Sequence, residues 1–185
     1  MSSAQDLALL IKNKFQDQTE VVIGISGFGG SGKTTLANNL VEVLDDAKSI
    51  SIDGFLLRDK FYELTEDANS FDRARFEEQV LKHTHAPEIN YQVYDWDKDK
   101  LITTKIRRPK YLIIEGISIW HPGLEDYYDF KIWVDESLED SHKAGKQRPG
   151  ESQNVKYWDE VWTPSDKAYY EKYRPDKLAD VKYKR

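Results

Sequence analysis

The fold of this chain is decided by residues 27 to 35, which read Gly-Phe-Gly-Gly-Ser-Gly-Lys-Thr-Thr. Gly27, Gly32, Lys33 and Thr34 occupy the four fixed positions of the phosphate-binding pattern G-x-x-x-x-G-K-[ST]. Glycines let the backbone turn sharply, so that consecutive N–H groups surround phosphate oxygens. The stretch predicts a P-loop whose nucleotide-binding residues are Gly27, Gly29, Gly30, Ser31, Gly32, Lys33, Thr34 and Thr35.

The sequence on either side of the glycines has the context that this pattern requires. An apolar run over residues 21–25 predicts a strand before the loop, and Leu36, Leu40 and Leu44 recur at helical spacing after it. A phosphate held there would lie at a helix N-terminus. Lys33 can then reach the β- and γ-phosphates, and the Thr34 hydroxyl can be a ligand of Mg²⁺. We therefore expect ATP and Mg²⁺ as cofactors.

Strand-like and helix-like segments alternate along the rest of the chain. Strands are predicted at residues 49–52, 111–114 and 130–134, the last two as buried apolar runs. A hairpin is predicted at 91–96 with 101–106, preceded by a helix that Ser70 caps. Such alternation is typical of the α/β class. We expect one P-loop NTPase domain over residues 1–185, with a parallel sheet of about five strands and helices on both faces. The polar stretch 143–154 is predicted to be a small lid.

The composition limits the partners of the protein. Its 185 residues have a formal net charge of −6 and include no cysteine. An acidic chain disfavours nucleic acid, whose phosphates select basic surfaces. No apolar run reaches membrane-spanning length, and the first residues lack the basic start of a signal peptide. We expect a cytoplasmic protein with a small-molecule partner, no nucleic acid and no membrane; the oligomeric state stays open.

Two carboxylates follow predicted strands. Asp53 comes after Ile52, and Glu115 comes after Ile114. Ligands of parallel sheets gather at the carboxyl ends of the strands. Each residue precedes a glycine, so each alone is equally consistent with an ordinary turn. Beside a P-loop, however, they supply a base for an alcohol and a carboxylate that holds Mg²⁺ directly or through water.

From about residue 21 to its end, the chain resembles the uridine kinase and phosphoribulokinase group of P-loop kinases. The similar segments are the P-loop, Asp53, Phe71-Asp72, Val93-Tyr94-Asp95-Trp96, Ile113-Ile114-Glu115-Gly116, the lid from Lys143 to Arg148, and Tyr169 to Asp180. The resemblance implies that Asp53 is the catalytic base and that Asp72 binds ribose hydroxyls. It also implies that Tyr94 and Trp96 line a base pocket, and that Arg148 acts with Lys33 on the transferring phosphoryl group.

The residues by themselves allow plainer interpretations. Asp72 could be a first-turn helix acid, Tyr94 and Trp96 could be core residues, and Arg148 could be a surface residue. Asp97-Lys98-Asp99-Lys100 stands where uridine kinases usually have a histidine, and Asp53-Gly54-Phe55 is similar to the Asp-Gly-Phe of pantothenate kinases.

We expect phosphate transfer from ATP to a nucleoside 5′-hydroxyl. Pantothenate or another small alcohol is the alternative acceptor. A non-catalytic ATP-binding regulator is the alternative of another class, against which the presence of Lys33, Thr34, Asp53 and Glu115 argues.

Overall fold

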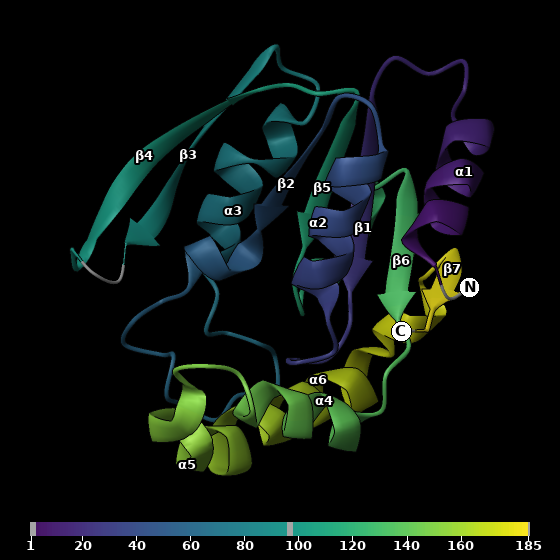
Figure 1. Ribbon diagram of the computed structural model, residues 1–185. Helices are drawn as coiled ribbons and strands as arrows, with labels where there is room; N and C mark the ends of the chain where they lie inside the picture. The colour runs from purple at the N-terminus through teal and green to yellow at the C-terminus, as the bar shows by residue number, and fades with distance from the viewer. Residues whose placement is uncertain (1–2, 96–97, 185) are drawn as a thin grey trace.

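A five-stranded parallel sheet forms the centre of the chain. The computed structural model describes residues 3–95 and 98–184, and the sheet has the strand order β2-β5-β1-β6-β7 (Figure 1). Its strands are β1 (Val21–Ser26), β2 (Ala47–Ser51), β5 (Tyr111–Glu115), β6 (Phe130–Val134) and β7 (Val181–Tyr183). Every neighbouring pair is parallel. The predicted α/β class and the predicted parallel sheet are confirmed.

The middle of the sheet is buried on both faces. β1 and β5 are buried at every position, as is typical of apolar parallel strands. The helices α1 (Ala4–Lys14) and α2 (Lys33–Val43) pack on the face that includes Ile23. The helix α3 (Arg73–Gln79) packs on the opposite face, which includes Val22. Alternate residues of β1 thus serve two apolar cores, one on each side.

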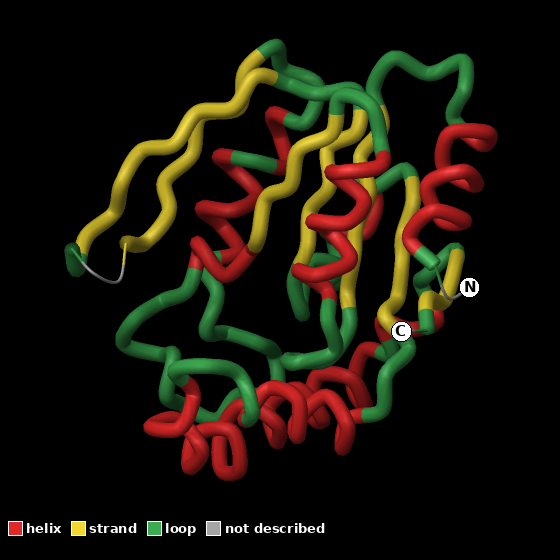
Figure 2. The backbone as a smooth tube through the Cα atoms, viewed as in Figure 1, coloured by secondary structure: helices red, strands yellow, loops and turns green. Residues whose placement is uncertain are grey.

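An antiparallel hairpin stands apart from the main sheet. It consists of β3 (Glu88–Asp95) and β4 (Lys100–Arg107), which pair with each other in a separate two-stranded sheet. Figure 2 shows these two strands extending outward on the side of α3. The predicted hairpin is confirmed. The predicted pocket residue Trp96 lies outside the described residues.

The start of α3 differs from the prediction. Ser70 was expected to cap this helix, but the N-cap is Asp72, whose carboxylate accepts a hydrogen bond from the Arg75 N–H at 3.0 Å. Aspartate is as good an N-cap as serine, and its charge is favourable at the positive end of the helix. The helix therefore begins two residues later than expected, and Ser70 belongs to the preceding loop, where its carbonyl accepts from the Leu57 N–H.

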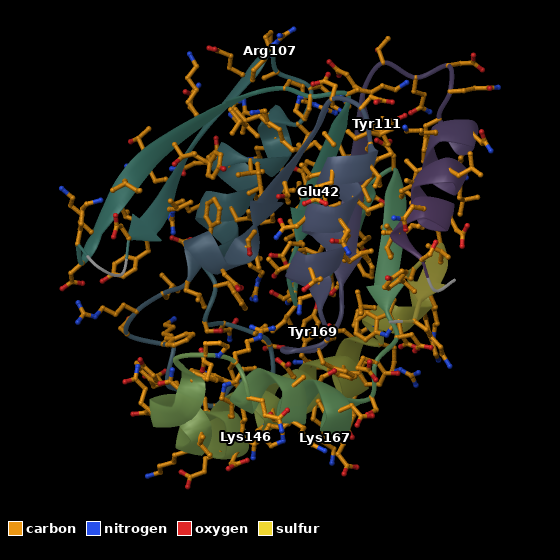
Figure 3. All side chains as sticks on the ribbon, viewed as in Figure 1. Glu42, Arg107, Tyr111, Lys146, Lys167 and Tyr169 are labelled. Carbon is orange, nitrogen blue, oxygen red and sulfur yellow. The ribbon has the colours of Figure 1, made fainter. Side chains whose placement is uncertain are left out.

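A C-terminal helical segment, residues 138–173, covers the carboxyl ends of the strands (Figure 1). It comprises α4 (Leu138–Lys146), a 3₁₀ turn (Glu151–Asn154), α5 (Val155–Tyr157), a π-helical turn (Trp158–Trp162) and α6 (Thr163–Tyr173). The stretch 143–154, predicted as a lid, thus begins in the last turn of α4. Figure 3 shows Tyr169 on the side of α6 toward the sheet and Lys167 on the outer side. Within the described ranges, no helix has the length and apolar character needed to cross a membrane.

Candidate active site

The P-loop, residues 27–34, connects β1 to α2 and has the conformation of a phosphate cradle. Gly30 and Gly32 have φ angles of 86° and 100°, a left-handed region that other residues adopt only at a cost. α2 begins at Lys33 and has neither a side-chain cap nor an acidic residue in its first turn. The N–H groups at this helix start therefore keep their positive potential for an anion.

The first turn of the P-loop packs closely against the C-terminal helical segment. A Cβ atom added to Gly30 would lie 2.0 Å from the carbonyl oxygen of Ser141 in α4. Such an approach is far below van der Waals contact, so only glycine fits at this position. The buried Ser31 hydroxyl has no hydrogen-bond partner among the described residues. Open amides at a helix start and a buried hydroxyl without a partner fit a phosphate ligand.

Lys33 is buried beneath the P-loop, and its ammonium group donates to the Phe28 carbonyl at 2.8 Å. Burial lowers the pKa of Lys33, while the nearby carboxylates of Glu115, Asp166 and Asp53 oppose this effect. The cation therefore lies among three carboxylates. It is the lysine of the P-loop pattern, the residue expected to meet the β- and γ-phosphates.

Thr34 and Glu115 come together at the start of α2 and the end of β5. The Thr34 hydroxyl donates to the Glu115 carboxylate at 3.2 Å. Burial raises the pKa of Glu115, and Asp53 adds to this effect, whereas Lys33 opposes it. A hydroxyl and a carboxylate are oxygen ligands of the kind that Mg²⁺ takes together with phosphate oxygens. The two residues predicted as metal ligands therefore have a geometry that fits the ion.

Asp53 lies in the 3₁₀ turn Ile52–Phe55 that follows β2. Burial raises the pKa of its carboxyl group, and the positive charges of Lys33 and Arg148 lower it in part. Asp53, Lys33, Thr34, Glu115 and Arg148 all line one cavity of about 210 Å³. The structure thus brings together predicted catalytic and metal-binding residues that are spread over residues 33–148 of the chain.

The lining of this cavity is aromatic and acidic. The rings of Phe61, Phe71, Trp158 and Trp162 line it, and the Phe61 and Trp162 ring centroids are 4.9 Å apart. Its ionisable residues are the carboxylates of Asp53, Glu63, Glu115, Glu151 and Asp166 and the cations of Lys33 and Arg148. The cavity lining therefore has three more carboxylates than cations. This excess affects which acceptor molecules the cavity can bind.

Comparison with known proteins points to one group of enzymes. The chain is 34% identical over 123 residues to a uridine kinase of Borrelia duttonii, and 30% identical over 154 residues to a pantothenate kinase of Streptomyces coelicolor. A structure titled as that of a possible uridine kinase from Bacillus stearothermophilus has a TM-score of 0.77, at 19% identity, over 97% of each chain. No protein-family model matches. The chain is thus similar in sequence to uridine and pantothenate kinases over part of their length.

The sequence matches cover only part of these relatives. The match spans 62% of this chain and 60% of the Borrelia uridine kinase, and 68% of this chain and 46% of the Streptomyces pantothenate kinase. The likeness to the Bacillus structure extends over nearly all of both chains, and it shows that the chain has the fold of P-loop kinases. The resemblance seen in the motifs is confirmed.

Of the residues predicted to bind the acceptor, Asp53 lines the cavity, whereas Asp72 and Tyr94 do not. Asp72 caps α3 and forms an ion pair with Arg75 at 3.1 Å. Tyr94, in β3, is hydrogen-bonded to Asp99 and Arg58. Neither belongs to the residues that line the cavity. Their role toward a ribose or a base therefore stays a prediction.

Asp166 is a site residue that the motifs did not reveal. It lies in α6, is 8% exposed, and its carboxylate accepts a hydrogen bond from the Gly29 N–H at 2.6 Å. Burial raises its pKa to about 6, although the Gly29 N–H and Lys33 pull in the opposite direction. The only local signal was an acid two residues after Pro164, which is typical of an ordinary first helical turn.

Proposed function

We propose that this chain transfers the γ-phosphate of ATP to a hydroxyl group of a small molecule. The observation that carries the proposal is the convergence of Lys33, Thr34, Asp53, Glu115 and Arg148 on one cavity at the mouth of a P-loop. These residues supply a phosphate-binding cation, metal ligands, a base and a second cation, which together meet the needs of phosphoryl transfer. The kinase names of the sequence relatives support the same reaction class.

Thr34 and Glu115 would hold Mg²⁺, which would supply positive charge against the negative charge of the phosphates during transfer. Glu115 serves this role in its ionised form, and the positive charge of Lys33 favours that form against the effect of burial. The ammonium group of Lys33, which donates to the Phe28 carbonyl, would exchange this partner for phosphate oxygens when a nucleotide binds.

Asp53 would orient the acceptor hydroxyl and take its proton. Burial raises the pKa of this carboxyl above its ordinary value, which makes the carboxylate a stronger base nearer to neutral pH. Lys33 and Arg148 lie close enough to Asp53 to lower that pKa in part. The same two cations can stabilise the negative charge that spreads over the transferring group.

We further propose that the acceptor is an uncharged molecule with a flat ring, of which a nucleoside is the best candidate. The aromatic wall of Phe61, Phe71, Trp158 and Trp162 offers apolar ring faces. The excess of carboxylates in the cavity disfavours an acceptor that carries its own carboxylate, as pantothenate does. Both cations of the cavity lie beside Asp53, where the phosphoryl group needs them.

A coupled ADP-release assay with a panel of alcohols tests this function. The panel contains ribonucleosides, their 2′-deoxy analogues, sugars and pantothenate, and Lys33→Met serves as the inactive reference. We expect nucleosides to be phosphorylated and Lys33→Met to lose at least about a hundredfold in rate, a few kcal/mol of transition-state stabilisation. Turnover of pantothenate alone would refute the acceptor class. ATP binding without turnover of any alcohol would favour the non-catalytic regulator.

A further inference from the structure

The carboxylate of Asp166 lies on the P-loop itself. Its Oδ2 atom accepts the Gly29 N–H at 2.6 Å, and a Cβ atom added to Gly29 would lie 3.1 Å from that oxygen and 3.3 Å from the ring of Trp158. An acid and an indole from the C-terminal helical segment therefore cover this part of the phosphate cradle. Both residues are less than 9% exposed.

A P-loop binds phosphate because its backbone N–H groups point at the anion. The Gly29 N–H can donate one strong hydrogen bond, and the carboxylate of Asp166 already accepts it at 2.6 Å. A phosphate oxygen that approaches the same N–H would meet a like charge in a buried setting, where electrostatic interactions are strong. The Asp166 contact and a phosphate on Gly29 therefore exclude each other.

We propose that Asp166 competes with the terminal phosphate of the nucleotide for the Gly29 amide, and so determines how tightly this chain binds ATP. The inference rests on the nucleotide site of the proposed function, but not on the identity of the acceptor. The carboxylate accepts the Gly29 N–H in the structure, and in this proposal it occupies the position that a phosphate oxygen would take. Nucleotide binding then requires α6 to withdraw Asp166 from the loop, or the carboxyl group to be protonated.

The charges around Asp166 agree with this role. Lys33 from α2 attracts its carboxylate, whereas Asp53 from the turn after β2 repels it. Glu115 from β5, and Arg148 and Glu151 from the stretch after α4, line the same cavity. With its pKa near 6, Asp166 is ionised at neutral pH and loses its charge in mild acid. Competition should therefore be strongest above pH 6 and fade below it.

The test compares Asp166→Asn with wild type by calorimetric titration of ATP, inorganic tripolyphosphate and adenosine, without any acceptor. The asparagine oxygen can still accept the Gly29 N–H, but the competing charge is gone. At pH 8 we expect the variant to bind ATP and tripolyphosphate more tightly by about fivefold to tenfold, the effect of removing one close like charge. Adenosine should bind equally to both. The difference between variant and wild type should shrink toward pH 5.

Glu171→Gln is the matched control, because it removes one negative charge from the exposed side of the same helix, where Glu171 is 65% exposed. Asp166→Ser, a smaller neutral substitution, replaces Asp166→Asn if the latter does not fold. Weaker or unchanged tripolyphosphate binding in the Asp166 variants at pH 8, or a gain that Glu171→Gln reproduces, would overturn the proposal. A chain that binds ATP as expected but phosphorylates no alcohol would refute the function and leave this inference intact.

Discussion

The Thr34 hydroxyl donates a hydrogen bond to the Glu115 carboxylate at 3.2 Å, across 81 positions of sequence. Thr34 is in the first turn of α2, and Glu115 is the last residue of β5, which pairs directly with β1. The P-loop and the neighbouring strand end are thus joined by the two oxygen groups that we propose as ligands of one ion. Groups that share a ligand should not act independently.

Thr34→Val and Glu115→Gln should each raise the Mg²⁺ concentration needed for half-maximal activity by about tenfold or more, because each removes one oxygen ligand or its charge. The double variant should be less impaired than the product of the single effects predicts. A magnesium titration of the steady-state rate measures this. Thr103→Val, on the exposed face of β4, controls for the substitution itself. Fully multiplicative effects would show that the two residues serve separate functions.

Asp53→Asn should lower kcat by about a hundredfold or more while ATP affinity changes little, since the amide keeps the shape but cannot accept a proton. Because burial raises the pKa of Asp53, wild-type kcat should fall as the pH drops through that raised value. The residual kcat of the variant should not show this fall at low pH. Steady-state measurements of kcat over pH 5–8 report the effect on proton transfer, and an ATP titration reports the effect on nucleotide affinity. Collapse of ATP binding would instead assign Asp53 to the metal or to the fold.

Asp72→Ala separates two roles of one carboxylate. The contact that the structure shows, to the Arg75 N–H at 3.0 Å, is a helix cap, and its loss should lower the free energy of unfolding by about 1 kcal/mol. Asp72→Ser restores a capping oxygen and should recover most of this stability. Urea unfolding and the acceptor KM are measured on the same samples. If KM rises for both variants while the serine restores stability, Asp72 also binds the acceptor, as the resemblance implies.

The buried carboxyl of Asp166 should make stability depend on pH. Its pKa is about 6 in the folded chain and 3.8 ordinarily, so the folded state holds the proton more tightly. The contribution of Asp166 to wild-type stability should therefore decrease as the pH rises from about 4 to about 6, by an amount on the order of 3 kcal/mol. Asp166→Asn should lack this part of the decrease, so its advantage over wild type grows with pH and levels off above pH 7. Urea unfolding at pH 4, 5, 6 and 7.5 measures the difference. An advantage that is constant with pH would contradict the raised pKa.

The parts of the site that the sequence predicted are local in the chain. The P-loop is one continuous stretch, and Asp53 and Glu115 each follow a predicted strand, of which the one before Glu115 is a continuous apolar run. Since parallel strands end at one edge of a sheet, the meeting of these residues follows from the order of elements alone. The cavity that they share confirms this placement.

The remaining parts depend on tertiary contacts that no spacing encodes. Asp166 reaches Gly29 from 137 positions away, and nothing near it distinguishes it from an ordinary helical acid. Phe61 and Trp162 meet only when the loop before α3 packs against the π-helical turn. Ser70 and Asp72 are both good helix caps by intrinsic propensity. Asp72 caps α3 because the backbone of Ser70 is hydrogen-bonded to Leu57 in the preceding loop.

The π-helical turn at Trp158–Trp162 has a consequence for the register of the segment that follows it. Trp158 and Asp166 are eight residues apart, yet both face Gly29. Eight steps of a regular α-helix turn through about 80° more than two full turns, which would separate the two side chains. One inserted residue in a π turn leaves the equivalent of seven steps, about 20° short of two turns. A regular α-helix over the same residues would keep all the amino acids that contact Gly29, but it would rotate Asp166 by about 100° away from the P-loop.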